Sequence, residues 1–260
     1  MSVSLRSRSY SRSNIPATSG KPCFSDRSRD NAAIVTRHPL HRPVWNALSS
    51  GWSSLAQGGP RAWRIDPRYG PFAAAADNGV EAQAALATLV PKDGELWMVE
   101  PDPVMTPPGT RVLREAMLVQ MVAEEMTGNA PSIDPSLLND DDAAEMRALA
   151  RMTKPGPFLS LTHRLGRFIG MRDKGKLVAM AGERMRVPGF AEISGVCTHP
   201  EHRGKGYAKA LMQIVARAML ERGETPFLHA YAAHEATVAL YGTLGFHVRA
   251  RMHMKVVVPD

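Results

Sequence analysis

Cysteine is nearly absent from this chain of 260 residues, which contains Cys23 and Cys197 and no other. Cys23 lies in a polar segment and Cys197 in an apolar run, so the sequence predicts no disulfide framework and a reducing, cytoplasmic location. No stretch of about 18 consecutive apolar residues occurs, which argues against a membrane-spanning helix. With 44% hydrophobic and 22% charged residues the composition is globular, which excludes wholesale disorder, a collagen-like repeat and a coiled-coil rod.

The part of the chain that is expected to fold, residues 31–260, also lacks a strongly basic composition. The net charge is +7, but residues 1–30 carry +4, residues 31–110 carry −1 and residues 111–260 carry +4. Strong attraction to a phosphate backbone needs a basic folded body. We therefore do not expect nucleic acid to be a partner; the alternative is a nucleic-acid-associated protein that acts through residues 1–30.

Residues 1–36 are predicted to form a disordered, basic tail rich in serine and arginine. Nine of the first thirty residues are serine, and large apolar residues are too few to offset the chain entropy. Because it has several arginines and no acidic residue before Asp26, the tail resembles a transit peptide. The alternative is an extension without function that comes from an over-long gene start.

Residues 37–110 are predicted to form a small, helical N-terminal subdomain whose role the sequence does not reveal. Two stretches look helical, Val44–Leu55 and Glu81–Val90, and the run Glu95–Val99 looks like a strand. Four prolines between residues 101 and 108 then mark a connection, because proline ends helices and blocks central strands.

Strands and helices alternate in residues 111–260. The stretches predicted as strands are Ala116–Ala123, Phe168–Met171, Leu177–Ala181, Phe190–Thr198, Pro226–Tyr231 and Phe246–Val258. Helices are predicted at 139–151, 207–222 and 235–244. Asn139 can cap the first of them, and Asp140, Asp141 and Asp142 are assigned to its positive end and not to a metal site.

The segment from His199 to Ala208, with the sequence HPEHRGKGYA, is the most informative one. Gly204 and Gly206 let the backbone approach a ligand closely, and free N–H groups at the start of the next helix can bind anionic oxygens. A Walker-type nucleotide site is excluded, because Lys205 is followed by glycine and not by Ser or Thr. A dinucleotide site is excluded too, because Lys209 stands in place of the third glycine.

The remaining histidine, serine and cysteine residues do not form a further metal-binding or nucleophilic motif. The closely spaced histidines lack the cysteine or acidic partners of a zinc site, so no metal is expected. Ser194 lacks the preceding glycine of a nucleophile elbow. Cys197 is predicted to be a small core residue and not a nucleophile.

The glycine-containing turn resembles the acyl-CoA signature of the GNAT superfamily of acyl-CoA-dependent N-acyltransferases. Arg203, Gly206 and Ala208 match its R/Q-x-x-G-x-G/A pattern. A strand ending in GVCT precedes the turn, another strand follows the next helix, and residues 240–246, LYGTLGF, are similar to the family's L-Y-x-x-L-G-F ending. The resemblance covers roughly residues 111–260, and its strand-rich style is most similar to the C-terminal domains of glycine N-acyltransferases.

The resemblance implies an α/β (α+β) fold, in which a mixed, largely antiparallel sheet is flanked by helices and splayed open between its fourth and fifth strands to admit pantetheine. It also implies that the backbone N–H groups of residues 204–208 bind the pyrophosphate, that residues 196–198 pair with pantetheine as an extra strand, and that an N–H near Val196 polarises the thioester carbonyl. His234 stands where the family often has an asparagine that contacts the cofactor arm. The cofactor-binding positions carried over in this way are Val196, Cys197, Thr198, Arg203, Gly204, Lys205, Gly206, Tyr207, Ala208 and His234.

Two residues are candidates for catalysis. Tyr241 resembles the family tyrosine that acts as general acid toward the leaving thiolate, and a phenol with a pKa of about 10 is protonated at neutral pH. The alternative is that Tyr241 only packs against the sheet. Glu192 has the spacing of the glutamate of histone-acetyltransferase-like members, where apolar neighbours would raise its pKa and suit it to act as a base. The alternative is a solvated or salt-bridged strand residue.

These features predict an acyltransferase that moves an acetyl group from its co-substrate acetyl-CoA directly to a primary amine of a small molecule or amino acid. One alternative is a non-catalytic CoA-sensing or regulatory module with the same fold, and another is an acetyltransferase for protein lysines or N-termini. The resemblance to glycine N-acyltransferases favours the small acceptor. No membrane partner is expected, and a homodimer is left open.

Overall fold

The computed structural model describes residues 38–129 and 132–260, which belong to one compact unit that spans Arg37–Asp260. The expectation of a disordered tail at residues 1–36 lies outside the described residues.

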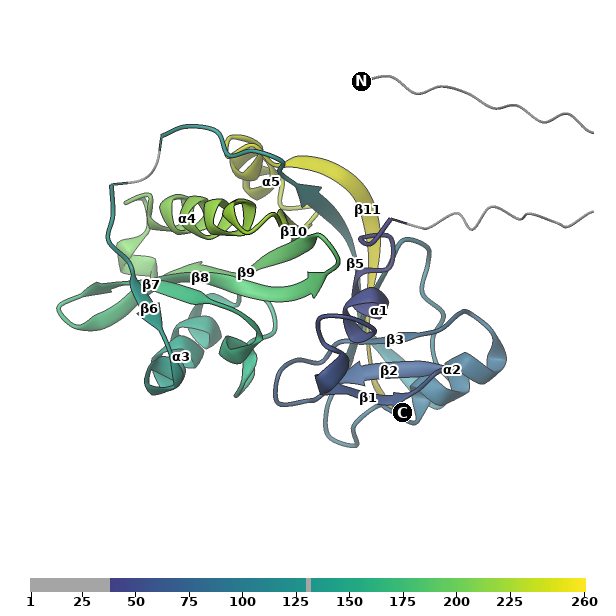
Figure 1. Ribbon diagram of the computed structural model, residues 1–260. Helices are drawn as coiled ribbons and strands as arrows, with labels where there is room; N and C mark the ends of the chain where they lie inside the picture. Colours follow the sequence, from purple (N-terminus) through teal and green to yellow (C-terminus); the bar gives the residue numbers. More distant parts are fainter. Residues whose placement is uncertain (1–37, 130–131) are drawn as a thin grey trace, which may run out of the picture. The chain divides into compact units, whose positions relative to one another are not determined.

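Eight strands form the main sheet, in the order β4-β11-β5-β10-β9-β8-β7-β6 (Figure 1). All neighbouring strands are antiparallel except β9 and β10, which are parallel. The strands are β4 Leu96–Glu100, β5 Thr110–Val122, β6 Ser136–Leu138, β7 Phe168–Asp173, β8 Lys176–Val187, β9 Phe190–Thr198, β10 Thr225–Tyr231 and β11 His247–Pro259. The expectation of a mixed, largely antiparallel sheet is confirmed.

Helices cover both faces of this sheet (Figure 1). The long helix α4, Tyr207–Glu221, packs the apolar stripe that contains Leu211 and Val215 against one face. Helix α3, Ala143–Thr153, packs Met146 and Leu149 against the other. In both helices the buried residues recur every three or four positions, which is the pattern of a helix with one covered side. In the described part of the chain, no helix has the length and hydrophobicity of a membrane span.

Strand β8 shows how the sheet divides the core. Ala179 and Ala181 belong to the cluster under α4, whereas Met180 belongs to the cluster under α3. Successive side chains of a strand point to opposite faces, so a strand that is covered on both sides requires a continuous apolar run.

The start of α3 is capped as the sequence predicts. A short 3-10 turn, η2 Asp140–Asp142, precedes it, and the Asn139 side chain accepts a hydrogen bond from the Asp141 amide at 2.8 Å. The Asp142 carboxylate accepts from the Asn139 amide at 2.9 Å, which completes a capping box. The three aspartates therefore belong to the helix start, and among the described residues no cluster of His, Cys, Asp or Glu is placed to hold a metal ion.

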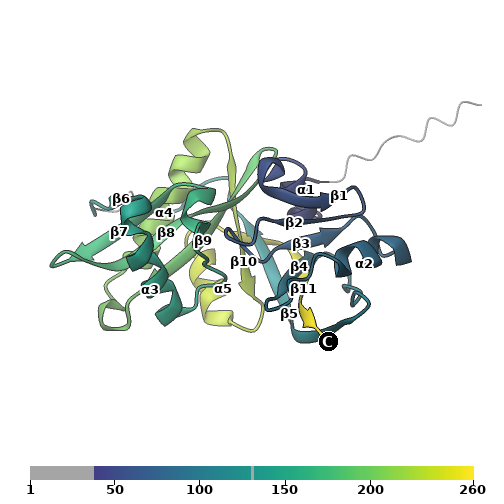
Figure 2. The same ribbon diagram turned by 90° about the horizontal axis from the view of Figure 1, so that it is seen from below.

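The N-terminal part of the described chain contains a second, three-stranded antiparallel sheet (Figure 2). Its elements are α1 Pro43–Leu48, η1 Ser53–Leu55, β1 Ala56–Gly59, β2 Ala62–Ile65, β3 Ala73–Ala75 and α2 Val80–Ala87. The prediction of a helical subdomain is therefore incomplete. Its strands have three or four residues and are rich in alanine and glycine, which are depleted in strands, so no strand pattern marks them.

The N-terminal part is joined to the main sheet by pairing and by a shared core. β4 pairs with β11, and the residues Trp52, Phe72 and Trp97 share an apolar cluster with Phe227 and Met252 of the main sheet. The expected boundary at residue 110 falls at the start of β5, which lies inside the sheet between β10 and β11. The segment 37–110 thus supplies both a small sheet of its own and one strand of the large sheet.

Candidate functional site

The parallel strands β9 and β10 separate soon after they begin. Their pairing covers 190–192 of β9 and 225–227 of β10, and it does not continue beyond Glu192. The remaining residues of β9 keep their pairing with β8 on the other side. β9 and β10 correspond to the fourth and fifth strands of the sequence prediction. The opening that the resemblance implied between those two strands is therefore present.

A β-bulge in β9 lies beside this opening. The register with β8 shifts between Met180 and Gly182, which leaves Gly195 and Val196 opposite a single residue. Gly195 has a φ of 64°, and a Cβ atom there would lie 2.8 Å from the Phe168 ring. Glycine is therefore required at this position, both for its backbone conformation and for space.

The turn after β9 begins with η4, Pro200–His202, and places two glycines with positive φ before α4. Gly204 has a φ of 79° and Gly206 a φ of 78°, and a Cβ atom at either residue would meet open space. The glycines are thus needed for the path of the backbone, and the space above them is available to a ligand.

Main-chain amides at the start of α4 have no partner within the described residues. The amides of His202 and Arg203 donate within η4, and the amide of Ala210 donates to the Gly206 carbonyl. Between them, the amides of residues 204–209 donate no hydrogen bond to a described residue, and no side chain caps the helix. Free amides at the positive end of a helix are suited to bind an anion such as a diphosphate.

A groove of about 620 Å³ lies over this turn. We call it the glycine-turn groove, and its lining comes from α3, β9, the turn, α4 and the helix α5, Glu235–Gly242. The lining residues are Thr153, Val196, Cys197, Thr198, His202, Arg203, Gly204, Gly206, Tyr207, Ala208, Lys209, Met212, Thr237, Leu240 and Tyr241. All the expected cofactor positions line it except Lys205, which is exposed in the turn beside it, and His234.

A second cavity, of about 220 Å³, adjoins the glycine-turn groove. We call it the inner cavity, and it includes residues of the N-terminal part as well as β8, β9, β10 and α5. It is lined by Phe72, Trp97, Val99, Leu118, Lys154, Pro155, Gly156, Pro157, Arg184, Met185, Val196, His229, Ala230, Tyr231, His234, Thr237, Tyr241 and Met254. Val196, Thr237 and Tyr241 line both spaces, so these residues stand at their junction.

Tyr241 is half-buried at this junction. Burial raises the pKa of its phenol above the usual value. Its hydroxyl makes no hydrogen bond to any residue that the structure describes, and the residue lines both spaces. The position and protonation state suit a general acid.

Glu192 does not match the expectation of a base with a raised pKa. Its side chain is fully buried, the Arg184 guanidinium donates to both of its oxygens at 2.8 Å, and His229 Nδ1 lies 2.8 Å from one of them. Burial by itself would raise the pKa, but the charge of Arg184 and the hydrogen bonds from His229 and Arg184 outweigh it and lower the pKa to about 2. Glu192 lines neither cavity, so the salt-bridged alternative is the one that the structure supports.

The buried amide of Gln120 fixes the tautomer of His229. Gln120 Oε1 accepts from Arg249 at 2.8 Å and its Nε2 donates to the Leu40 carbonyl at 3.1 Å, which determines the orientation of the amide. The same Nε2 lies 3.1 Å from His229 Nε2, which must then accept, so the ring proton is on Nδ1 and is donated to Glu192. No local motif reveals this network, because its members come from strands far apart in the sequence.

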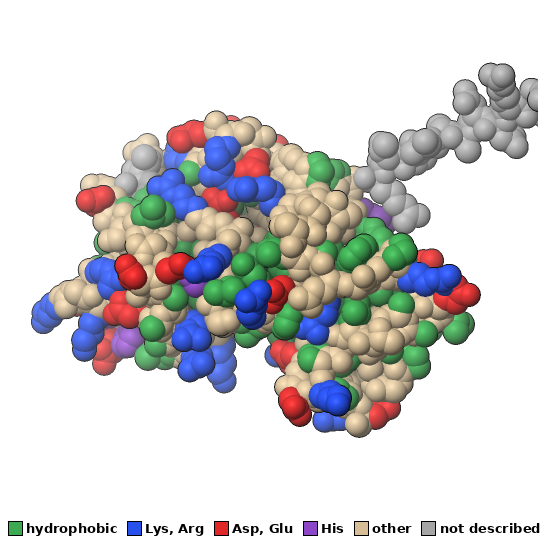
Figure 3. Space-filling model, turned by 60° about the horizontal axis from the view of Figure 1, so that its bottom comes forward, with side chains coloured by type: hydrophobic (Ala, Val, Ile, Leu, Met, Phe, Trp, Pro, Cys, Tyr) green, Lys and Arg blue, Asp and Glu red, His purple; other side chains and the backbone are tan. Residues whose placement is uncertain are grey.

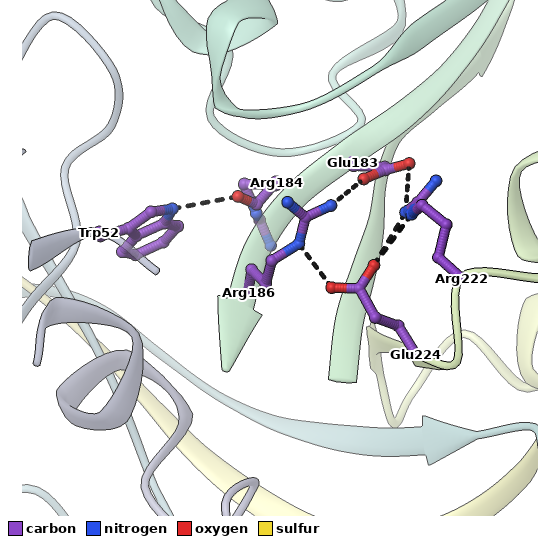
Figure 4. A network of polar contacts seen from close by, with 6 residues as sticks. All are labelled: Trp52, Glu183, Arg184, Arg186, Arg222 and Glu224. Carbon is purple, nitrogen blue, oxygen red and sulfur yellow. Dashed lines mark hydrogen bonds and ion pairs between the residues drawn. The ribbon is translucent and has the colours of Figure 1, made fainter. Parts of the chain in front are cut away.

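A second bulge explains how β8 reaches the inner cavity with two consecutive side chains. The register with β9 shifts between Glu183 and Arg186, and Arg184 and Met185 both line the inner cavity. Trp52 donates its indole N–H to the Arg184 carbonyl at 3.1 Å, so the N-terminal part contacts the bulge (Figure 4).

The residues on either side of this bulge, Glu183 and Arg186, belong to an ion-pair network. This network connects β8 to the loop after α4 (Figure 4). Arg186 contacts Glu183 and Glu224 at 2.8 Å each. Arg222 contacts the same two carboxylates at 2.9 and 3.0 Å. Glu183 is buried, and both of its oxygens are paired, as a buried carboxylate requires.

Cys197 is a core residue, as predicted. It is buried, and burial raises the pKa of its thiol to about 11. At neutral pH it is a thiol and not a thiolate, so it is not a reactive nucleophile.

Comparisons with known proteins agree with this geometry. The FR47-like protein family model matches residues 168–255. A solved structure from Novosphingobium aromaticivorans, named as an acetyltransferase of the GNAT family, is 48% identical with a TM-score of 0.79, and the match covers 86% of this chain and 99% of that one. A GCN5-related N-acetyltransferase from Kribbella flavida, 15% identical with a TM-score of 0.57 over 83% of this chain and 95% of that one, shares the fold.

A curated relative, the uncharacterized N-acetyltransferase YobR of Bacillus subtilis, is 30% identical over 90 residues. That match covers 34% of this chain and 36% of the relative, so the chain spans about a third of its length. The Novosphingobium structure, in contrast, is matched over nearly its whole length at high identity. The chain belongs to the GNAT family of acetyltransferases.

Proposed function

We propose that this chain transfers the acetyl group of acetyl-CoA directly to a primary amine of a small molecule or an amino acid. The observation that carries the proposal is the row of free amides of residues 204–209, which lies in a groove that Tyr241 also lines. A helix start with free amides is suited to bind the diphosphate, and a phenol that lines both the groove and the inner cavity is suited to act on the thioester.

The residues of the glycine-turn groove fit the co-substrate. The amides at the start of α4 would bind the diphosphate, with Arg203 and Lys209 adding positive charge beside them. The open side of β9 at residues 196–198, which has lost β10 as a neighbour, would pair with the pantetheine arm. An acetyl thioester bound in this way supplies the electrophilic carbonyl.

In the proposed reaction the amine nitrogen bonds to the acetyl carbon while the C–S bond breaks. Tyr241 donates its proton to the departing sulfur, the proton of the amine passes to solvent, and the phenolate of Tyr241 takes a proton back from solvent. Glu192 is not assigned as the base, because it is buried behind Arg184 and His229. Transfer is direct, because the buried thiol of Cys197 is not suited to form an acyl-enzyme.

The inner cavity supports a small acceptor. Its volume of about 220 Å³ is below the range of roughly 300–1,000 Å³ that is typical of drug-sized ligands. Basic and acidic side chains are interspersed on the face shown in Figure 3, which supports a partner other than nucleic acid. A cytoplasmic location is part of the proposal, and the unpaired buried thiol of Cys197 supports it.

The substitution Gly206→Glu tests the assignment of the groove. It places a carboxylate in the open space above the free amides, so calorimetry should detect no binding of acetyl-CoA. Gly189→Glu is the matched control, because Gly189 also has a φ of 78° and open space around its Cβ position but lies in the turn between β8 and β9. Unchanged affinity in Gly206→Glu would show that the co-substrate binds elsewhere.

Thiol release from acetyl-CoA in the presence of a panel of amines separates the enzyme from the CoA-sensing alternative. An acetyltransferase releases the thiol in proportion to acetylated amine, which mass spectrometry identifies. Tight binding of acetyl-CoA with no acceleration by any amine would favour the sensing module.

A further inference from the structure

The inner cavity has basic lining residues and no acidic ones. Lys154 and Arg184 line it, together with His229 and His234, whereas no Asp or Glu of the described chain does. An acceptor with several ammonium groups would find no carboxylate to pair with in this cavity. An acceptor that carries an anionic group would find partners for it.

Arg184 lines this cavity, and one of its guanidinium nitrogens, Nη1, has no partner among the described residues. Its Nε and Nη2 are bound to Glu192, and the guanidinium carbon lies 4.7 Å from the centroid of the Phe72 ring, so the group is held in place. Its Nη1 donates to no described residue and lies 3.9 Å from the position that a Cβ atom on Gly156 would occupy, at the cavity wall. A planar donor that is already oriented loses little freedom when it binds a carboxylate.

Lys154, two residues before Gly156, supplies a second positive charge to the lining of the cavity. It ends α3 with a φ of 52°, and the following residues 155–157 line the cavity with it. Its side chain is exposed and makes no ion pair with any described carboxylate. The charge of Lys154 is therefore not neutralised, in contrast to that of Arg184.

The wall contributed by the N-terminal part and by β5, β8 and β11 is apolar. Phe72, Trp97, Leu118, Met185 and Met254 are buried residues that line the cavity. An apolar side chain of the acceptor can be covered by them, whereas a second charged group would lose its hydration without a partner.

We propose that the inner cavity binds the carboxylate of the acceptor through Arg184 Nη1 and Lys154, and that the acceptor is a free amino acid with a neutral, apolar side chain. The proposal rests on the proposed function, in which the inner cavity receives the amine. It sets this acceptor class apart from polyamines, aminoglycosides and protein lysines, none of which presents a carboxylate next to the reacting nitrogen.

A pair of acetylated compounds tests the carboxylate site directly. N-acetylleucine and N-isopentylacetamide share the alkyl chain and the acetamide but differ in the carboxylate, and calorimetry on the CoA-loaded protein compares their affinities. We expect N-acetylleucine to bind about tenfold more tightly or better, because a hydrogen bond to a charged group favours it. Equal affinities, tighter binding of the uncharged compound, or binding of neither compound would overturn the proposal.

Substitutions assign the effect to the residues named. Lys154→Met should lower the affinity for N-acetylleucine by about tenfold and leave that for N-isopentylacetamide unchanged. Lys92→Met is the matched control, since Lys92 is exposed and lines neither space, and it should change neither affinity. A Lys154→Met protein that binds both compounds as the wild type does would remove Lys154 from the site.

Transfer to leucine and to isopentylamine then distinguishes this inference from the proposed function. A higher kcat/KM for leucine supports both. Equal or faster transfer to isopentylamine overturns the carboxylate inference while the acetyltransferase activity stands. Transfer to neither amine, in a protein that prefers N-acetylleucine, contradicts the proposed function and leaves the carboxylate site supported.

Discussion

Tyr241 is the residue on which the proposed chemistry depends most directly. Replacing it by phenylalanine keeps the ring and removes the proton donor at the junction of the two spaces. We expect Tyr241→Phe to lower kcat by about 100-fold, within the range for a general acid, and to leave the Kd of acetyl-CoA unchanged. Steady-state kinetics and calorimetry measure the two quantities. A kcat equal to that of the wild type would favour the alternative in which Tyr241 only packs.

Glu192 makes the stability of the protein sensitive to acid. Its pKa is lowered to about 2 in the folded chain, from a reference value of 4.5. A lowered pKa means that the stabilisation is fully present above pH about 4.5 and is lost as the pH falls toward 2. We expect Glu192→Gln to reduce this acid-side loss of stability, measured by urea unfolding at a series of pH values.

At neutral pH the same variant should be less stable by about 3 kcal/mol, because Arg184 loses its partner in a buried ion pair. The exposed Glu201 provides the control, and Glu201→Gln should follow the wild-type pH profile. Asp140 also has a pKa lowered to about 2, by hydrogen bonds from Arg164 and His163, so some acid sensitivity will persist in both variants. A Glu192→Gln protein with the full wild-type pH dependence would contradict the assignment.

The contrast between Tyr241 and Glu192 shows what sequence reasoning can reach at the scale of single residues. The local pattern LYGTLGF predicts a role for Tyr241 in the site, and the structure places this residue at the junction of the two spaces. Glu192 has a local spacing that predicts a base, but its environment is set by Arg184, His229 and Gln120, which lie on other strands. The apolar residues next to Glu192 in the sequence do not indicate which charged residues of other strands will contact it.

Among the elements, the bulge at Gly195 is the one with the sharpest steric requirement. Gly195→Ala introduces a Cβ atom that would lie 2.8 Å from the Phe168 ring, at a residue with a φ of 64°. The matched control is Gly109→Ala, because Gly109 has a φ of 68° but open space around its Cβ position. In both variants backbone strain should lower the free energy of unfolding by about 1 kcal/mol or more. In Gly195→Ala the contact with the Phe168 ring should lower it by about 1–3 kcal/mol in addition.

Urea unfolding measures this difference in the free energy of unfolding. Equal losses in the two variants would show that the Phe168 ring moves aside without cost. Because Val196 is the other residue of the bulge and lines both spaces, Gly195→Ala should also reduce transfer more than Gly109→Ala does.

At the scale of elements, the sequence predicts most of the main sheet and its helices but not the N-terminal sheet. The boundaries of β9 and the start of α4 agree with the prediction to the residue, because an apolar run and a glycine turn mark them. The order of the strands was not predictable, since nothing near Thr110–Val122 indicates that β5 pairs with both β10 and β11. Pairing across such distances is decided by packing and not by local pattern.

As a whole, the described chain should unfold as one unit. All four tryptophans, Trp45, Trp52, Trp63 and Trp97, lie in the N-terminal part, whereas α3, α4 and α5 lie beyond it. Because Trp52, Phe72 and Trp97 share a core with the main sheet, tryptophan fluorescence and far-ultraviolet circular dichroism should give the same urea midpoint. An earlier fluorescence transition would show that the N-terminal part unfolds on its own.

The position of β11 between β4 and β5 has a consequence for biosynthesis. On the ribosome, β4 and β5 are translated well before β11, so each has an unpaired edge until β11 emerges. Exposed strand edges invite pairing with other chains. We therefore expect the nascent polypeptide to be more prone to pairing with other chains, until residues 247–259 emerge, than a protein whose neighbouring strands are consecutive in the chain.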